Sequence, residues 1–175
     1  MCNFKVVEVR DHQWSNIINK CLSYDFYHTQ AYNLLEKVNK PVLFTLYFNE
    51  ELIAIPLIIR QIPDSEWLDC TSAYGYCGPI STIDMDLIPN EYITKFQEAM
   101  LNYFSQNNII STFSRLHPLI STGNFFNNFG TVVDLNKTIA IDLRLAIDEQ
   151  RKQFRKSNKS ELNQLRNRGY QVKIA

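Results

Sequence analysis

The sequence predicts an α/β fold with a mixed, largely antiparallel sheet flanked by helices. Two observations lead to this fold class. Two long apolar runs, residues 41–48 and 52–59, flank the short polar turn 49–51, which is the pattern of a β-hairpin. A later stretch that begins at Pro89 repeats its apolar residues at helical spacing and leads into the apolar run 109–113. This order indicates a long amphipathic helix followed by a buried strand.

The residues before the hairpin are expected to form one strand and two helices. Apolar side chains recur over residues 4–9, as in a strand. Asp11 can cap a helix that ends at about Cys21, and a second, short helix follows Thr29. The second helix is expected to bury three side chains, those of Tyr32, Leu35 and Val38.

The remaining elements follow from the same patterns. Pro56 lies inside the second arm of the hairpin, which favours an edge position or a bulge there. The predicted elements outside the hairpin and the long helix are a strand at 67–71, a loop at 119–130, strands at 131–135 and 138–143, a helix at 146–168 and a strand at 170–175. Gly169 suits the position after the end of that last helix.

Composition limits the class of protein. A content of 45 % hydrophobic and 21 % charged residues is typical of a soluble globular protein, and 175 residues suffice for one well-buried domain spanning 1–175. The sequence contains neither an apolar run of about 20 residues nor a signal-peptide pattern at its start, so we expect a cytoplasmic protein without a transmembrane segment. The four cysteines and three histidines lack metal-ligand spacing, which predicts reduced thiols and no metal.

Charge is distributed unevenly along the chain. Residues 137–175 hold ten Lys and Arg against four Asp and Glu, a net of +6, whereas residues 1–136 hold eight against fourteen, a net of −6. The basic segment either docks on the acidic body or binds an anion. Transfer RNA is one such anion, although few aromatic residues accompany these charges.

Two unusual segments carry the candidate site. Residues 71–80 combine glycines, a proline and the aromatic side chains of Tyr74 and Tyr76, and residues 113–119 contain Arg115 and His117. Both segments directly follow predicted strands, and ligands of α/β sheets collect beyond the carboxyl ends of strands. We therefore expect the two segments to lie side by side as the walls of one cleft.

Each of these side chains also has a purely structural interpretation. Tyr74 and Tyr76 either pack around a tight turn or stack on a sugar or nucleotide. Arg115 and His117 either satisfy loop carbonyls or act on a ligand, Arg115 by binding a phosphate and His117 as hydrogen-bond partner or base. Cys77 with His117 is a third alternative, the nucleophile and base of a hydrolase, which rests on no spacing pattern.

Five segments in this order resemble the FemABX-like branch of the GNAT acyltransferase superfamily. They are Asp25-Phe-Tyr-His-Thr29, the apolar hairpin, Thr71-Ser-Ala-Tyr-Gly-Tyr-Cys-Gly-Pro79, Phe113-Ser-Arg-Leu-His-Pro118 and Arg151-Lys-Gln-Phe-Arg155. Proteins of this family contain two GNAT-like halves, and this sequence is similar to the N-terminal half. The resemblance implies a GNAT-like fold and the transfer of an acetyl or aminoacyl group to an amine or hydroxyl of a cell-envelope sugar or peptidoglycan precursor.

The resemblance also implies how the site would be divided. Tyr74, Tyr76, Arg115 and His117 would bind the acceptor, a small or lipid-linked molecule, and Lys156 with Lys159 would close its rim. The donor, an acyl-CoA or an aminoacyl-tRNA, would be bound by a C-terminal half, because this chain has no glycine-rich pyrophosphate loop. Asn158 and Lys159 depart from the family's usual His and Arg, and lysine lacks the planar fork of arginine. The alternative is a noncatalytic binding module with the same fold.

Overall fold

A computed structural model describes residues 2–173. The chain divides into two compact units, residues 1–134 and residues 135–175, and each is described by itself. The prediction of a single domain over residues 1–175 stays a prediction, because the two units are not placed relative to each other.

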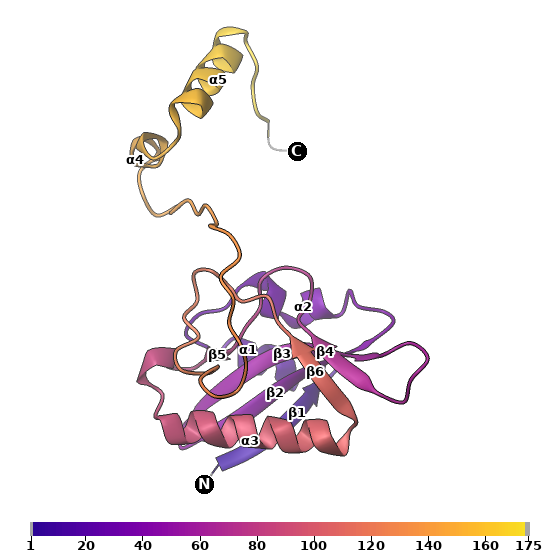
Figure 1. The fold of residues 1–175 in the computed structure, drawn as a ribbon. Helices are drawn as coiled ribbons and strands as arrows, with labels where there is room; N and C mark the ends of the chain where they lie inside the picture. The colour runs from indigo at the N-terminus through magenta and orange to yellow at the C-terminus, as the bar shows by residue number, and fades with distance from the viewer. Residues whose placement is uncertain (1, 174–175) are drawn as a thin grey trace. The chain divides into compact units, whose positions relative to one another are not determined.

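The first unit is an open six-stranded sheet flanked by helices (Figure 1), which confirms the α/β class and the largely antiparallel sheet. The strands are β1 (Cys2–Glu8), β2 (Lys40–Phe48), β3 (Glu51–Gln61), β4 (Leu68–Thr71), β5 (Ile80–Ser81) and β6 (Ile109–Phe113). The helices are α1 (Gln13–Ile18), α2 (Gln30–Asn33), α3 (Asn90–Gln106) and the short 3₁₀ turns η1 (Phe26–His28) and η2 (Met85–Leu87). The strand order is β1-β2-β3-β4-β6, with β5 beside β3, and among these six strands only β4 and β6 pair in parallel.

The hairpin lies where the sequence predicts it. β2 and β3 pair antiparallel from Phe48↔Glu51 to Lys40↔Ile59. The two-residue turn between them is entered by Asn49 at φ 52°, a conformation that asparagine adopts more readily than most residues. Its arms read as continuous apolar runs because helices cover the sheet on both faces, so alternate residues of one strand face two different cores.

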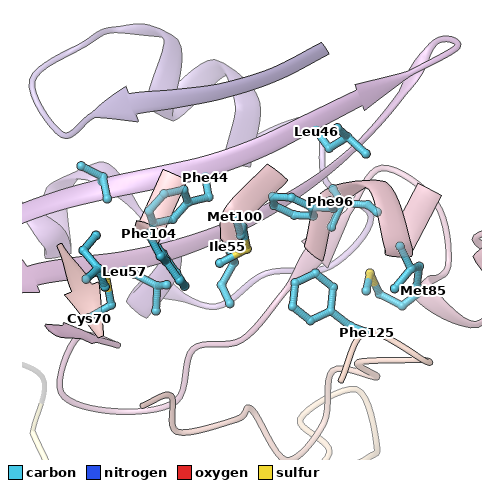
Figure 2. Close-up of a cluster of buried hydrophobic side chains, with 14 of the residues drawn as sticks. Phe44, Leu46, Ile55, Leu57, Cys70, Met85, Phe96, Met100, Phe104 and Phe125 are labelled. Carbon is cyan, nitrogen blue, oxygen red and sulfur yellow. The ribbon is translucent and has the colours of Figure 1, made fainter. Parts of the chain in front are cut away.

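The two cores have different partners. Helix α3 crosses one face of the sheet (Figure 1), and its buried side chains Phe96, Met100 and Phe104 lie against Phe44 and Leu57 (Figure 2). Helix α1 covers the other face through a second cluster of buried side chains: Trp14, Ile17 and Ile18 from the helix, Leu43 from β2 and Ala54 from β3. Fully burying one such large side chain stabilises the fold by roughly 1.5–3 kcal/mol. These clusters make the sheet a rigid base for the loops at its edge.

Strands β4 and β5 occupy the same edge of β3 and are joined by a large excursion of the chain. Thr71 pairs with Ile58, and Ile80 pairs with Ala54. Residues 72–79 therefore leave the edge of β3 opposite residues 55–57 and return to it. Pro56 lies in this gap, where β3 has no partner on that edge, so its missing N–H costs no ladder bond there. The expected edge position of Pro56 is wrong, because β3 is an inner strand of the sheet. Pro56 instead lies between the segments of β3 that pair with β4 and with β5.

Several local predictions are wrong. The first helix ends at Ile18 rather than Cys21. Leu35 and Val38 are exposed, because α2 has a single turn that ends at Asn33 and cannot turn a long face inward. Strand β6 is not buried as expected: only Ile109 is inside, because β6 is the edge strand and pairs with β4 alone among the described strands.

The second unit contains two short helices, α4 (Ile147–Lys152) and α5 (Lys156–Asn167), in place of the single helix expected at 146–168. Arg168 is the C-cap of α5, and Gly169 follows it at φ 81°, as predicted. Residues 131–143 and 170–173 form no strand, because no described segment pairs with them; residues 174 and 175 lie outside the described residues. No helix within residues 2–173 has the length and apolar character needed to cross a membrane.

Candidate functional site

The two predicted segments meet at the carboxyl ends of β4 and β6. The parallel pairing of these strands ends at Thr71↔Phe113, and a further bridge joins Cys77 to Leu116. The Cys77 N–H donates to the Arg115 carbonyl at 2.8 Å, and the His117 N–H donates to the Cys77 carbonyl, also at 2.8 Å. The expectation that the segments lie side by side is confirmed.

A glycine allows the excursion at residues 72–79 to pack closely against the 3₁₀ turn η1. Gly75 has φ 116°, and a Cβ atom built on it would lie 2.1 Å from Cε1 of Tyr27. The ring of Tyr27 therefore occupies the space that any other residue at position 75 would need. The Tyr32 hydroxyl donates to the Tyr74 carbonyl at 2.6 Å, which fastens the tip of the excursion to α2.

Arg115 lies over two exposed aromatic rings. The centre of its guanidinium is 5.7 Å from the ring centroid of Tyr74 and 5.3 Å from that of Phe113, both within the range of a cation–π contact. Tyr74 is 83 % exposed and Phe113 is 54 % exposed. Core packing therefore does not account for Tyr74, whereas Tyr76, 41 % exposed, packs edge-on against Tyr27 and His117.

His117 is held by two hydrogen bonds. The Leu119 N–H donates to Nδ1 at 3.1 Å, so the neutral ring carries its proton on Nε2. Nε2 lies 2.8 Å from the Asp25 carboxylate and donates to it. Both ring nitrogens are thus occupied within the chain, and His117 has no lone pair free to accept a proton from a ligand. The geometry fits a histidine that positions its segment better than a general base.

A second histidine, His28, contacts the same aspartate that holds His117. His28 is fully buried, and its Nδ1 accepts a hydrogen bond from the Asp25 N–H at 3.1 Å. Burial lowers the pKa of His28 from 6.5 to about 4, because the charged ring would lose its hydration; hydrogen bonding to the Asp25 backbone opposes this effect only in part. His28 is therefore neutral at pH 7. Asp25 contacts both histidines and so connects η1 to the segment at residues 113–118.

Sequence patterns did not assign these supporting residues to the site. Asp25, Tyr27, His28 and Tyr32 lie about 40 residues or more before the segments they hold, and no periodicity connects them. The available signal was the Asp-Phe-Tyr-His-Thr run beginning at Asp25, in which an aspartate precedes a histidine by three residues, the spacing of a capping box.

The hydrolase alternative is wrong. Cys77 is fully buried, and burial raises the pKa of its thiol from 9.0 to about 12. A nucleophilic cysteine needs a lowered pKa and access to the substrate, and Cys77 has neither. Within residues 2–173 no group of three or more His, Cys, Asp or Glu side chains lies close enough together to hold a metal ion.

The other predicted site residues belong to the second unit. Lys156 and Lys159 lie in the first turn of α5, where Lys159 Nζ donates to the Lys152 carbonyl at 2.9 Å. Their predicted place at the rim of the site stays a prediction, because the two units are described separately.

Three residues of the expected cleft, Tyr74, Tyr76 and Arg115, are exposed on the surface of the first unit. Two shallow hollows lie elsewhere on the surface and include none of Tyr74, Tyr76, Arg115 and His117. One is lined by Glu8, Arg10, Lys37 and Lys40, among others, and the other by Leu22, Ile80, Met85 and Leu119, among others. We name the exposed side chains Tyr74, Tyr76, Phe113 and Arg115 the aromatic–arginine face.

Comparisons with protein-family models, with curated proteins and with solved structures find no match for this chain. The fold and the site define a class of protein: an α/β protein with a mostly antiparallel open sheet, whose exposed aromatic and arginine side chains gather at the carboxyl ends of the parallel strands β4 and β6.

Proposed function

We propose that this chain supplies the acceptor side of a FemABX-like acyltransferase of the GNAT superfamily. The reaction would transfer an acetyl or aminoacyl group to an amine or hydroxyl of a cell-envelope sugar or peptidoglycan precursor. The observation that carries the proposal is the bridge between residues 72–79 and residues 113–117, which presents Tyr74, Tyr76 and Arg115 together at the carboxyl ends of β4 and β6.

In this proposal the chain binds the acceptor and does not activate the donor. Arg115 attracts an anionic group of the acceptor, and Tyr74 offers a ring for an apolar or planar part of it. His117 holds its segment in place through Asp25. The acyl-CoA or aminoacyl-tRNA would be bound by a second GNAT-like half, and Lys156 with Lys159 would close the rim of the acceptor site. The resemblance in segment order supports this division.

The test is acyl transfer measured with and without a second half. We expect the 175-residue chain to show no turnover of acetyl-CoA, because it lacks a loop that could hold a pyrophosphate. A gene product that continues beyond Ala175 with such a loop should transfer the acyl group, and Arg115→Ala in that protein should raise the KM for the acceptor. The proposal would be contradicted if the 175-residue chain alone turned over acetyl-CoA and a substitution on the aromatic–arginine face abolished this activity. Such a result would mean that no second half is needed to bind the donor.

A noncatalytic binding module is the alternative function. The open, exposed surface at Tyr74 and Phe113, where both ring nitrogens of the neighbouring His117 are already hydrogen-bonded, favours this alternative. The two functions differ in one measurement: a module binds its ligand with full affinity and never transfers a group, whatever donor is supplied.

A further inference from the structure

Arg115 differs from the other well-placed arginine of the first unit. Arg60 donates to both oxygens of Asp69, at 2.8 and 2.7 Å, and so has its fork satisfied within the chain. Arg115 has no hydrogen bond from its side chain and no carboxylate within ion-pairing distance among residues 2–173. Its contacts are instead the rings of Tyr74 and Phe113.

Stacking on aromatic rings orients a guanidinium without consuming its N–H donors. The guanidinium is planar and weakly hydrated, and its donors point outward in its own plane. A group held in this way is ordered before a ligand arrives, so less entropy is lost when two parallel N–H···O bonds form. The arrangement is suited to an oxygen anion that can accept both bonds in one plane.

The charge of the first unit distinguishes between the common oxygen anions. Residues 1–134 hold eight Lys and Arg against fourteen Asp and Glu, a net of −6. A phosphate carrying close to two charges gains about twice the attraction of Arg115, but it also meets about twice the repulsion of this field and loses more hydration than a carboxylate carrying one. Arg115 supplies a single cation, which balances one negative charge. The lone stacked arginine on an acidic body therefore favours the carboxylate.

We infer that the aromatic–arginine face recognises a carboxylate attached to an apolar or aromatic body, with the carboxylate on Arg115 and the body against the ring of Tyr74. The inference rests on the proposed acceptor role of this face and names the chemical class of its ligand. It makes Arg115 a specificity-determining residue, because a ligand of the same shape without the carboxylate would leave its fork unpaired.

The experiment is a titration of the full 175-residue chain with benzoate, acetate and inorganic phosphate at constant ionic strength, followed by NMR. The Nε–H signal of Arg115 and the amide signal of Tyr74 are the reporters, because both groups belong to this face. We expect benzoate to bind with a dissociation constant in the millimolar range, on the order of −4 kcal/mol, as suits one paired anion and one ring contact. Acetate should bind more weakly, and phosphate weakest.

Matched variants separate recognition from general attraction. Arg115→Gln should weaken benzoate binding roughly tenfold or more, and Arg115→Lys should weaken it as well, because lysine keeps the charge but loses the fork. Arg60→Gln, which removes the same charge from a satisfied arginine, should leave the benzoate affinity unchanged. Arg115 is exposed, so we expect its variants to keep the fold; an unchanged amide spectrum outside residues 71–80 and 113–119 checks this.

Two results would overturn the inference. Phosphate binding as tightly as benzoate at Arg115 would show that the face does not select carboxylates. Equal losses in the Arg60 and Arg115 variants would show that only net charge matters. Neither result tests acyl transfer. If the chain selects benzoate but transfers no acyl group when it is joined to a second half, the proposed function is wrong and the inference about the ligand still holds.

Discussion

Acidification should destabilise this protein through a single buried histidine. His28 is neutral in the fold, where burial lowers its pKa from 6.5 to about 4. Between these two values the unfolded chain binds a proton that the folded chain refuses, so the free energy of unfolding falls as the pH falls below 6.5. Linkage with these two pKa values gives a loss of about 2 kcal/mol between pH 7.5 and pH 5, and about 3 kcal/mol once the pH is below 4.

The variant that tests this effect is His28→Asn. The side-chain oxygen of asparagine can accept the Asp25 N–H, as Nδ1 does in the native chain, but it does not titrate. The variant should be less stable at pH 7.5, because it leaves a cavity, and its deficit relative to the native chain should shrink by about 2 kcal/mol at pH 5. His12→Asn is the matched control, since His12 is exposed and any effect common to histidine-to-asparagine changes would appear there as well.

Urea denaturation at several pH values provides the measurement. Trp14 is a suitable reporter of the first unit, because it is fully buried and its indole N–H donates to the His28 carbonyl at 3.0 Å. Contributions from titrating groups that do not interact with His28 cancel when the native chain and the variant are compared at each pH. A deficit of His28→Asn that stays constant from pH 7.5 to pH 5 would refute the reasoning, because it would mean that His28 takes up its proton in the fold as readily as in the unfolded chain.

Three further predictions concern the support of the site. Gly75→Ala should lower the melting temperature more than Gly78→Ala. Both glycines have φ near 120°, so the backbone strain of alanine is similar at the two positions. A Cβ atom at Gly78 meets no atom closer than 3.5 Å, whereas one at Gly75 meets Tyr27 at 2.1 Å. In a Tyr27→Ala background the extra loss at Gly75 should disappear, and its persistence would mean that the ring is not the obstacle. Asp25→Ala should cost about 1–3 kcal/mol and speed amide hydrogen exchange over residues 113–119, because the Nε2–H of His117 loses its acceptor; unchanged exchange there would show that Asp25 does not hold the segment. Alkylation of the native chain should reach the half-exposed Cys2 well before Cys21, Cys70 and Cys77, because burial raises the pKa of these three thiols to about 12. A mass-spectrometric peptide map measures the order of labelling, and rapid labelling of Cys77 would contradict its burial.

The sequence by itself determined the elements whose signals are local. The hairpin followed from two apolar runs around a polar turn, and α3 from helical spacing after Pro89, because hydrophobic periodicity and turn chemistry act over a few residues. The meeting of residues 71–79 with residues 113–118 was also predictable, since both follow strands and the carboxyl ends of parallel neighbours share one edge.

Only the tertiary structure decided what depends on partners far apart in the chain. The strand pattern of residues 131–143 forms no strand, because a strand requires a neighbour to complete its hydrogen bonds and no described segment provides one. Pro56 is tolerated inside an inner strand because the adjacent chain leaves the sheet opposite it. The pairing of Asp25 with His117 spans 92 positions of the chain, and no local pattern encodes it. Contacts of this kind arise when packing of the whole sheet brings the residues together, and they decide which side chains of the site are held and which are free to bind.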